Sequence, residues 1–172
     1  LSGNIHTGFN VYLKGKPCRA YMSDMKVRIA NGSKYYYPDV LVNCPPVNGY
    51  FTETPTIIVE VLSNSTCRID ETEKRLAYMQ IETLEEYVLI AQDFVQIEVI
   101  RKSEGWKSAK YFLGDEVIFT SIGLTLSVEE IYDGVDNADM VEWLKQKNVY
   151  CDSKKTFKYD EQFSNQNARL SY

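Results

Sequence analysis

The segment Thr56–Leu62 constrains the fold of this chain most strongly, because it is a nearly continuous apolar run interrupted by Glu60. Pro55 precedes the run and the polar turn Ser63–Ser65 follows it. A run of this length between turn signals is typical of a strand buried on both faces of a sheet. An ionised carboxylate there is costly unless a cation or strong hydrogen bonds compensate its charge. The sequence therefore predicts that Glu60 has a partner.

Asp39 is the candidate partner, because it follows a proline in the strand-like run Tyr35–Val42. Two carboxylates on neighbouring strands can converge on a divalent cation, and such a site can cleave phosphodiester bonds. Two alternatives stay open: Glu60 lies on a solvated face of an edge strand, or Asp39 is a turn residue. Alternation counts against the first alternative, because a solvated Glu60 would also expose Ile58 and Leu62.

The composition describes a globular chain of 172 residues, of which 44% are hydrophobic and 25% charged. No apolar run approaches the ~20 residues that a membrane-spanning helix needs. The single histidine, His6, excludes metal sites with several histidine ligands. The four cysteines, Cys18, Cys44, Cys67 and Cys151, lack the C-x-x-C spacing of zinc sites. We therefore expect reduced thiols in a cytoplasmic protein.

The net charge of −5 is unevenly distributed. Residues 1–50 carry six basic and two acidic side chains, or +4, whereas residues 51–142 carry seven basic and nineteen acidic, or −12. Residues 143–172 sum to +3. A basic N-terminal face can meet phosphates, although a solvated charged surface is the commoner explanation of such a count.

The periodicities predict an α/β sandwich on a mixed sheet. The expected helices cover residues 3–14, 70–82 and a short segment capped by Ser127 and Glu130; the expected strands cover 18–30, 35–42, 56–62, 87–91, 94–101 and 106–112. Residues 31–33 are expected to form a hairpin turn, and residues 151–172 a polar tail. On the helix 70–82, Lys74 is expected to share a side with Asp70, while Leu76, Ala77 and Met79 face the sheet.

Four segments together resemble the sequence pattern of one family: Tyr37–Val42, Pro55–Ser63, Asp70–Tyr78 and Glu85–Ile90. Gly123–Ser127 and Glu130–Tyr132 also resemble the C-terminal end of that pattern. The chain resembles the Uma-two family of "putative restriction endonucleases", within the PD-(D/E)XK nuclease-like superfamily. The resemblance covers roughly residues 1–134, which we expect to form the nuclease-like domain. Residues 135–172 are expected to add a helical turn and the polar tail.

The resemblance implies a restriction-endonuclease-like core, in which helices flank a mixed central β-sheet, and a site for Mg²⁺ or Mn²⁺. Asp39 and Glu60 match the two acidic positions, and the carbonyl of Val61 would be a third ligand. The lysine that the superfamily carries two positions after the second acid is replaced by Leu62. Lys74 matches a lysine on the following helix and would stabilise developing negative charge. Alternatively, Lys74 is a solvated helix lysine that pairs with Asp70.

The expected function is therefore a metal-dependent endonuclease that hydrolyses DNA. The alternative is a catalytically impaired nuclease-like domain that binds nucleic acid or protein, which Leu62 and the acidic net charge favour. The third hypothesis for the function of the chain is a purely structural domain with an exposed Glu60. The chain lacks an initiating Met, so we expect a preceding segment, which in this family carries a further acid.

Nucleases that cut both strands commonly act as two-fold dimers. Trp143, Leu144 and Tyr150 have no evident place in the core. We therefore expect these residues to pack on a second copy in a homodimer. The tyrosines Tyr35, Tyr36 and Tyr37 could border a substrate groove, although hairpin packing is the commoner role for such rings.

Overall fold

The computed structural model describes residues 1–29, 32, 34–47, 49–63 and 68–147. The chain divides into two compact units, Leu1–Asn137 and Ala138–Tyr172. The elements of the first unit are α1 (Ser2–Leu13), β1 (Arg19–Met22), β2 (Lys26–Arg28), β3 (Tyr35–Tyr36), β4 (Val40–Asn43), β5 (Phe51–Thr52), β6 (Pro55–Leu62), α2 (Arg68–Tyr78), β7 (Glu86–Ala91), β8 (Ile97–Arg101), η1 (Lys102–Glu104), β9 (Lys107–Tyr111), β10 (Glu116–Phe119), β11 (Leu124–Ser127) and α3 (Val128–Ile131). In the second unit, residues 138–147 are helical.

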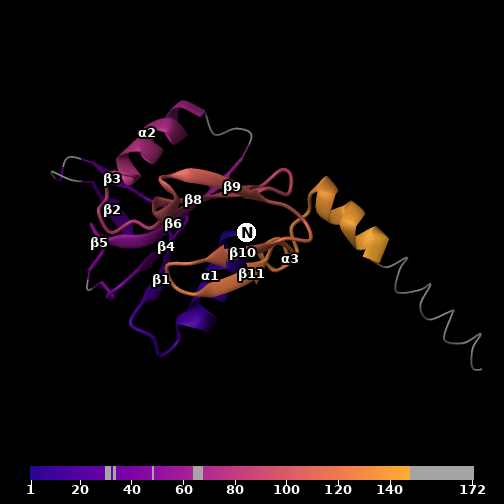
Figure 1. Cartoon of the computed structure of the whole chain (residues 1–172), viewed down its shortest axis with the longest axis horizontal. Helices are drawn as coiled ribbons and strands as arrows, with labels where there is room; N and C mark the ends of the chain where they lie inside the picture. Colours follow the sequence, from indigo (N-terminus) through magenta and orange to yellow (C-terminus); the bar gives the residue numbers. More distant parts are fainter. Residues whose placement is uncertain (30–31, 33, 48, 64–67, 148–172) are drawn as a thin grey trace, which may run out of the picture. The chain divides into compact units, whose positions relative to one another are not determined.

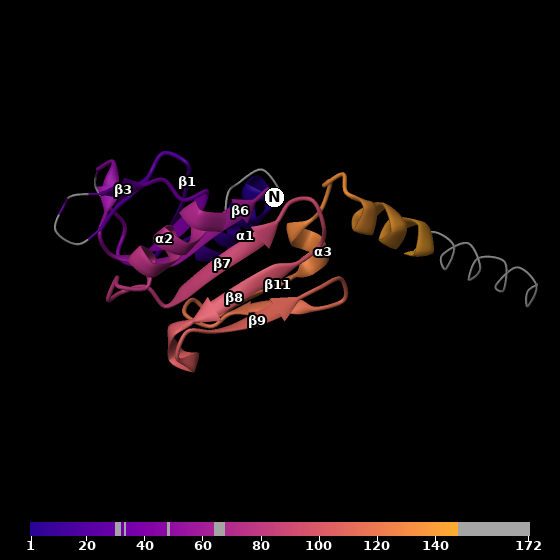
Figure 2. The ribbon, with the colours of Figure 1, turned by 90° about the horizontal axis from the view of Figure 1, so that it is seen from above.

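Six strands form the main sheet in the order β1-β4-β6-β7-β8-β9, and Figure 2 shows β6, β7, β8 and β9 of this sheet. The β6–β7 pair is parallel and the other neighbouring pairs are antiparallel, so the sheet is mixed as predicted. β6 lies inside the sheet between β4 and β7, and its residues from Ile57 to Glu60 are buried. The prediction of an interior strand at this segment is confirmed, and the edge-strand alternative is wrong.

Helices cover both faces of this sheet (Figure 1). One face carries Ile58 and Tyr87, which pack in one core cluster with Tyr78 of α2. On the other side, α1 contacts β1 and β4, and Phe9 of α1 meets Phe119 of β10 edge to face at 4.9 Å. This arrangement explains why β6 is apolar on both faces, and it confirms the α/β sandwich.

The predicted strand 35–42 is in fact two strands in two sheets. β3 pairs with β2 in a three-stranded sheet of order β3-β2-β5, whereas β4 joins the main sheet. Pro38 lies in the break between them, where its missing N–H and fixed φ favour an interruption of strand pairing. The antiparallel β2–β3 pair confirms the predicted hairpin; Asn31 and Ser33 of its turn lie outside the described residues.

The predicted inward face of α2 is partly wrong. Leu76 is 60% exposed, whereas Tyr78 is fully buried. The inward stripe instead joins Lys74, Ala77, Tyr78 and, just after the helix, Ile81, at the i, i+3, i+4, i+7 spacing of one helical face. Lys74 therefore lies on the side that meets the sheet.

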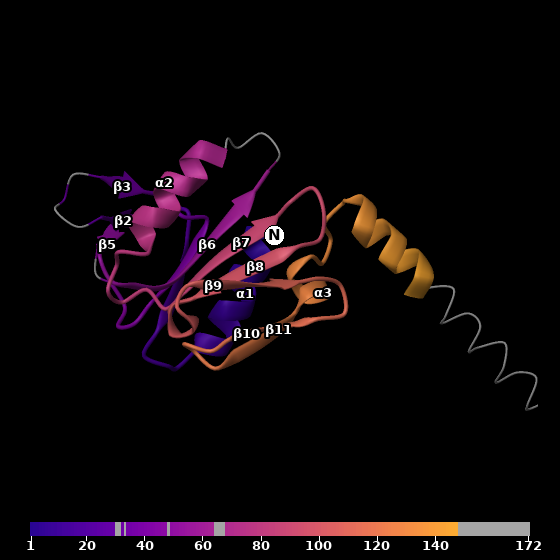
Figure 3. The same ribbon diagram turned by 45° about the horizontal axis from the view of Figure 1, so that its top comes forward.

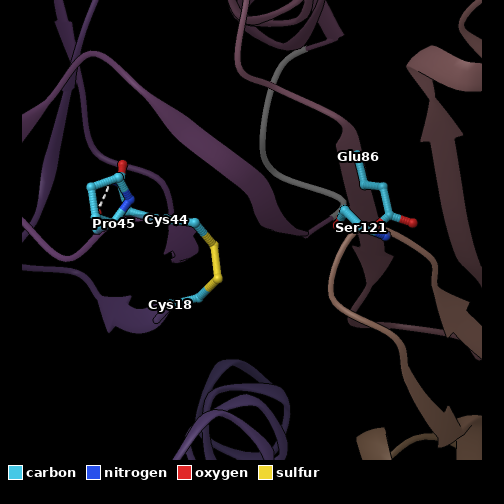
Figure 4. Close-up of a disulfide and its surroundings, with 6 residues drawn as sticks. Cys18, Cys44, Pro45, Glu86 and Ser121 are labelled. Atoms are coloured by element: carbon cyan, nitrogen blue, oxygen red, sulfur yellow. Dashed lines mark hydrogen bonds between the residues drawn. A yellow bond between two sulfur atoms is a disulfide. The ribbon is translucent and has the colours of Figure 1, made fainter. Parts of the chain in front are cut away.

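The expectation of reduced thiols is wrong for two of the four cysteines. Cys18 and Cys44 form a disulfide with Cα atoms 4.3 Å apart (Figure 4). β1 and β4 bring them together, because the Arg19–Asn43 pair at the end of this ladder is followed by Cys18 opposite Cys44. Cys67 and Cys151 lie outside the described residues. Among the residues that the structure describes, no helix has the length and apolarity to cross a membrane.

Candidate functional site

Asp39 and Glu60 lie directly opposite each other on neighbouring chain segments. In the β4–β6 ladder, Val40 pairs with Val59 in antiparallel register. Continuing that register by one residue sets Asp39 against Glu60. Directly opposed residues point to the same face of a sheet and have the closest Cβ atoms across the ladder. Asp39 is a bend residue just before β4, so the register places the two acids next to each other, and a shared cation between them stays a prediction.

Backbone hydrogen bonds hold Asp39 in place. Its Oδ2 accepts a hydrogen bond of 2.7 Å from the amide of Val61, the residue after Glu60. Its carbonyl accepts a 3.2 Å hydrogen bond from the amide of Ser23, just past β1. Asp39 therefore lies in the bend before β4, and its hydrogen bonds fix it to both neighbouring strands.

Helix α2 places two further polar groups at Glu60. The Tyr78 hydroxyl donates a 3.1 Å hydrogen bond to Glu60 Oε1, and the Lys74 Nζ lies 3.7 Å from the same oxygen. Tyr78 follows Lys74 by four residues, so both side chains leave the same face of the helix. The predicted direction of the lysine ammonium, toward the carboxylates, is confirmed. For residues 68–71 the structure describes the helical backbone but not the side chains, so the alternative pairing with Asp70 stays untested.

Tyr78 is the site residue that the motifs did not reveal. The signal was its i+4 spacing from Lys74, combined with the expectation that a buried carboxylate needs hydrogen-bond donors. Its ring is held by edge contacts with Tyr36 at 5.5 Å and by Tyr87 at 5.6 Å. Burial and the neighbouring Glu60 carboxylate raise the pKa of Tyr78, so this hydroxyl stays protonated and can only donate to the ionised acid.

Lys74 and Tyr78 do not fully compensate the cost of burying the Glu60 carboxylate. Glu60 is 7% exposed, and burial is the main reason that its pKa is raised to about 7. Lys74 and Tyr78 lower the pKa, while the Asp39 carboxylate raises it. Near neutral pH this acid is therefore balanced between its protonated and ionised forms, and further positive charge would favour the ionised form.

The donor set fits a hard divalent cation. Asp39 and Glu60 offer carboxylate oxygens on one face, and Mg²⁺ prefers oxygen ligands and keeps several waters. Lys74 supplies one positive charge to this pair, and the raised pKa of Glu60 shows that it does not offset the cost of burial. Within the described part of the chain, no group of three or more His, Cys, Asp or Glu side chains converges on a point. The two acids would therefore share a cation with water and a backbone carbonyl, for which Val61 is the predicted donor.

Leu62 stands where the resemblance described above would predict a lysine. It lies two residues after Glu60 on β6, and so on the same face of the strand. The cationic group that Leu62 cannot supply is brought to Glu60 by Lys74 from α2. The positive charge therefore reaches this acid from the helix above the sheet instead of from the strand.

A second buried carboxylate, Glu86, has a structural role. Its side chain accepts hydrogen bonds from the amides and hydroxyls of Thr120 and Ser121 (Figure 4). Arg101, its partner in the β7–β8 ladder, places Nε 3.4 Å from Glu86 Oε1 and donates to Tyr111 and the Ile118 carbonyl. Both carboxylate oxygens of Glu86 accept hydrogen bonds from protein groups, so the Glu86–Arg101 pair links the β10–β11 hairpin to the sheet. No pattern in the sequence predicts this pair.

Comparison with known protein families identifies the family to which this chain belongs. Residues 1–129 match a family model described as "Uma2: Putative restriction endonuclease". The chain belongs to the Uma2 family. It is 34% identical over 140 residues to the uncharacterized protein slr1290 of Synechocystis sp. (strain ATCC 27184 / PCC 6803 / Kazusa), covering 78% of this chain and 74% of that protein. A second Synechocystis protein, the uncharacterized sll1609, is 36% identical over 89 residues, covering 48% of this chain and 49% of that protein.

A solved structure supports the fold of this Uma2 chain. A crystal structure described as "a putative nuclease belonging to DUF820", from Anabaena variabilis ATCC 29413, superposes with a TM-score of 0.64. The match covers 76% of this chain and 77% of that chain at 16% sequence identity. At that identity the comparison establishes a shared architecture, and the predicted family and fold are confirmed.

Proposed function

We propose that this Uma2 protein is a metal-dependent endonuclease that hydrolyses phosphodiester bonds of DNA. The observation that carries the proposal is the pair of neighbouring acids, in which the amide of Val61 holds Asp39 and the Lys74 ammonium lies 3.7 Å from Glu60. An oxygen-rich, negatively charged pair with a cation at its rim suits a reaction in which a phosphate gains negative charge. Membership of a family described as "Putative restriction endonuclease" points to the same class of chemistry.

Each residue has a distinct role in this proposal. Asp39 and Glu60, with the Val61 carbonyl, would hold Mg²⁺ or Mn²⁺, which when bound polarises the scissile phosphate and lowers the pKa of a bound water. The Val61 amide orients Asp39, and the Tyr78 hydroxyl orients Glu60 and favours its ionised form. Lys74 would stabilise the negative charge that develops on the phosphate oxygens.

Cleavage of supercoiled plasmid DNA tests this proposal. The protein with Mg²⁺ or Mn²⁺ should nick or linearise the plasmid, and Asp39→Asn and Glu60→Gln should each abolish the activity. Glu98→Gln is the matched control, because Glu98 lies two strands away on the same face, opposite Leu89. Undiminished cleavage by both acid variants would refute the proposed site and indicate a contaminating nuclease.

The second candidate is a nuclease-like domain that binds without cutting. Leu62 at the motif position supports it, and so does the Lys74–Glu60 ion pair, which gives the buried acid a counterion without metal. This candidate predicts metal-independent binding to DNA or protein that Glu60→Gln leaves intact, with no cleavage by any variant.

A homodimer and a cytoplasmic location stay predictions. Trp143 and Leu144 belong to the helical segment 138–147, and Tyr150 lies outside the described residues. Light scattering at micromolar concentration would test the assembly, and a monomer would count against it.

A further inference from the structure

The small sheet β3-β2-β5 has one face that gathers aromatic rings and cations. Arg28 pairs with Tyr35 in the β2–β3 ladder, and Lys26 pairs with Phe51 in the β2–β5 ladder. Continuing the β2–β3 register sets Lys26 against Tyr37. Because alternate residues of a strand share a face, all five side chains lie on one face, which we call the aromatic–basic face.

The opposite face of the same sheet is buried. Val27 is fully buried and belongs to the core cluster beneath α2. Tyr36 packs against that cluster, and its hydroxyl lies 3.5 Å from Glu73 of α2. Thr52, the β5 partner of Val27, is also buried. The small sheet is therefore held in place by one face and presents the other; Figure 3 shows it beside α2.

The rings of the aromatic–basic face are open to solvent. Tyr37 is 55% exposed, Tyr35 45% and Phe51 39%. The Arg28 guanidinium lies 4.4 Å from the centre of the Phe51 ring, and Lys26 Nζ lies 5.4 Å from that of Tyr37. Three exposed rings on a short sheet exceed what packing of this sheet requires, since its core contacts lie on the other face.

The cations of this face differ in their availability. The Arg28 guanidinium donates to Glu53 at 2.8 Å, which fixes it beside Phe51. Lys26 has no carboxylate within ion-pair distance among the residues that the structure describes, so its ammonium can contact a phosphate. Proteins bind single-stranded nucleic acid with exposed aromatic rings and neighbouring cations. The bases stack on the rings, and the phosphates contact the basic groups. A duplex does not offer the faces of its bases in this way.

We propose that the aromatic–basic face binds unpaired bases of single-stranded nucleic acid and leads the strand toward the Asp39–Glu60 pair. Tyr37 precedes Asp39 by two residues, so the stacking surface adjoins the site along the chain. The inference rests on the proposed function and deepens it, because it names unpaired bases, which negative supercoiling also exposes in plasmid DNA, as the part of the substrate that this face contacts. Binding by this face is measurable without cleavage, so the two proposals can fail separately.

Fluorescence anisotropy in EDTA tests the proposal with the whole chain. The probes are a labelled 15-nucleotide oligothymidylate, an abasic oligomer of the same length, and a duplex of the same length. The protein should bind the oligothymidylate most tightly, and Tyr35→Ser and Tyr37→Ser should each weaken that binding by about fivefold or more, the usual effect of removing one stacking ring. Tyr37→Phe, which keeps the ring, should bind like the unaltered protein.

Phe112→Ser is the control, because Phe112 is a 48% exposed ring after β9, outside the small sheet. If the serine variants fail to fold, photocrosslinking of the unaltered protein to an oligomer containing 5-iodouracil replaces them, and the adducts should map to Tyr35, Tyr37 or Phe51. Equal binding of the abasic oligomer, equal effects of all the serine variants, or adducts confined to other segments would overturn the proposal. Intact binding without any cleavage would instead refute only the endonuclease.

Discussion

Lys74 and Glu60 form an ion pair between α2 and the interior strand β6, with Nζ and Oε1 3.7 Å apart. The Lys74 side chain is 33% exposed, whereas that of Glu60 is 9% exposed. The pair therefore joins a solvent-accessible cation to a carboxylate that folding has removed from water. Since the pKa of Glu60 is nonetheless raised to about 7, one lysine does not compensate the burial of this acid.

The raised pKa predicts that Glu60 makes stability depend on pH. Below its ordinary value of 4.5 the acid is neutral in both states, and above about 7 it is ionised in both. Between these values the folded protein binds more protons, so the free energy of unfolding should fall as pH rises, by about 3 kcal/mol at most. Burial of Glu60 is the main cause of this window; the Lys74 ammonium and the Tyr78 hydrogen bond lower the pKa, and the Asp39 charge raises it.

Urea unfolding of the protein and of Glu60→Gln, in EDTA at pH 4.5 to 8, measures this contribution. The two stabilities should be similar at low pH, and the glutamine variant should become the more stable of the two at pH 8. Glu98→Gln should show no such divergence. Parallel stability curves for the protein and Glu60→Gln would show that the acid titrates normally.

Lys74→Met tests the role of the ammonium. The ligands stay in place, so the affinity for Mn²⁺ at pH 8 should change little, whereas turnover should fall strongly, by about 100-fold if one preorganised charge contact is lost. The pKa of Glu60 should rise further, because Lys74 lowers it. Turnover within about twofold of the unaltered protein would mean that Lys74 is only a counterion.

Tyr78→Phe isolates the hydrogen bond to Glu60. The ring and its contacts with Tyr36 and Tyr87 remain, but the ionised carboxylate loses a donor worth about 1.5–3 kcal/mol. The pKa of Glu60 should therefore rise, and the pH at which Mn²⁺ binding is half-maximal should rise with it. Tyr36→Phe is the control, since its hydroxyl lies 3.5 Å from the exposed Glu73. The idea fails if both variants have the same pH profile.

The Cys18–Cys44 disulfide should stabilise the folded chain. It links residues separated by 26 positions, and closure of a loop of this size contributes about 3 kcal/mol in the chain-entropy account. Reduction, or replacement of both cysteines by alanine, should lower the denaturant midpoint accordingly. Identical midpoints with and without reductant, together with full alkylation of both thiols in the native protein, would show that the two cysteines are unpaired in solution.

The sequence predicted the interior strand and its acid because a continuous apolar run between turn signals, such as Thr56–Leu62, is typical of a strand buried on both faces. Glu60 was identified by the same reasoning, since its charge was the exception in the run. The failures have local causes: Pro38 divides a strand that reads as continuous, and the inward face of α2 follows Tyr78 instead of Leu76. The Cys18–Cys44 bond was missed because its geometry depends on the β1–β4 register, which pairs residues far apart in sequence.

Metal binding tests the central claim most directly. Mn²⁺ should titrate into the protein at pH 8 with one site, and crystals soaked in Mn²⁺ should show an anomalous peak within about 2.5 Å of both an Asp39 and a Glu60 oxygen, the range of metal–oxygen distances in such sites. Asp39→Asn and Glu60→Gln should each remove most of the binding. Saturating Mn²⁺ with no peak between the two carboxylates, or undiminished titration by both variants, would contradict the account.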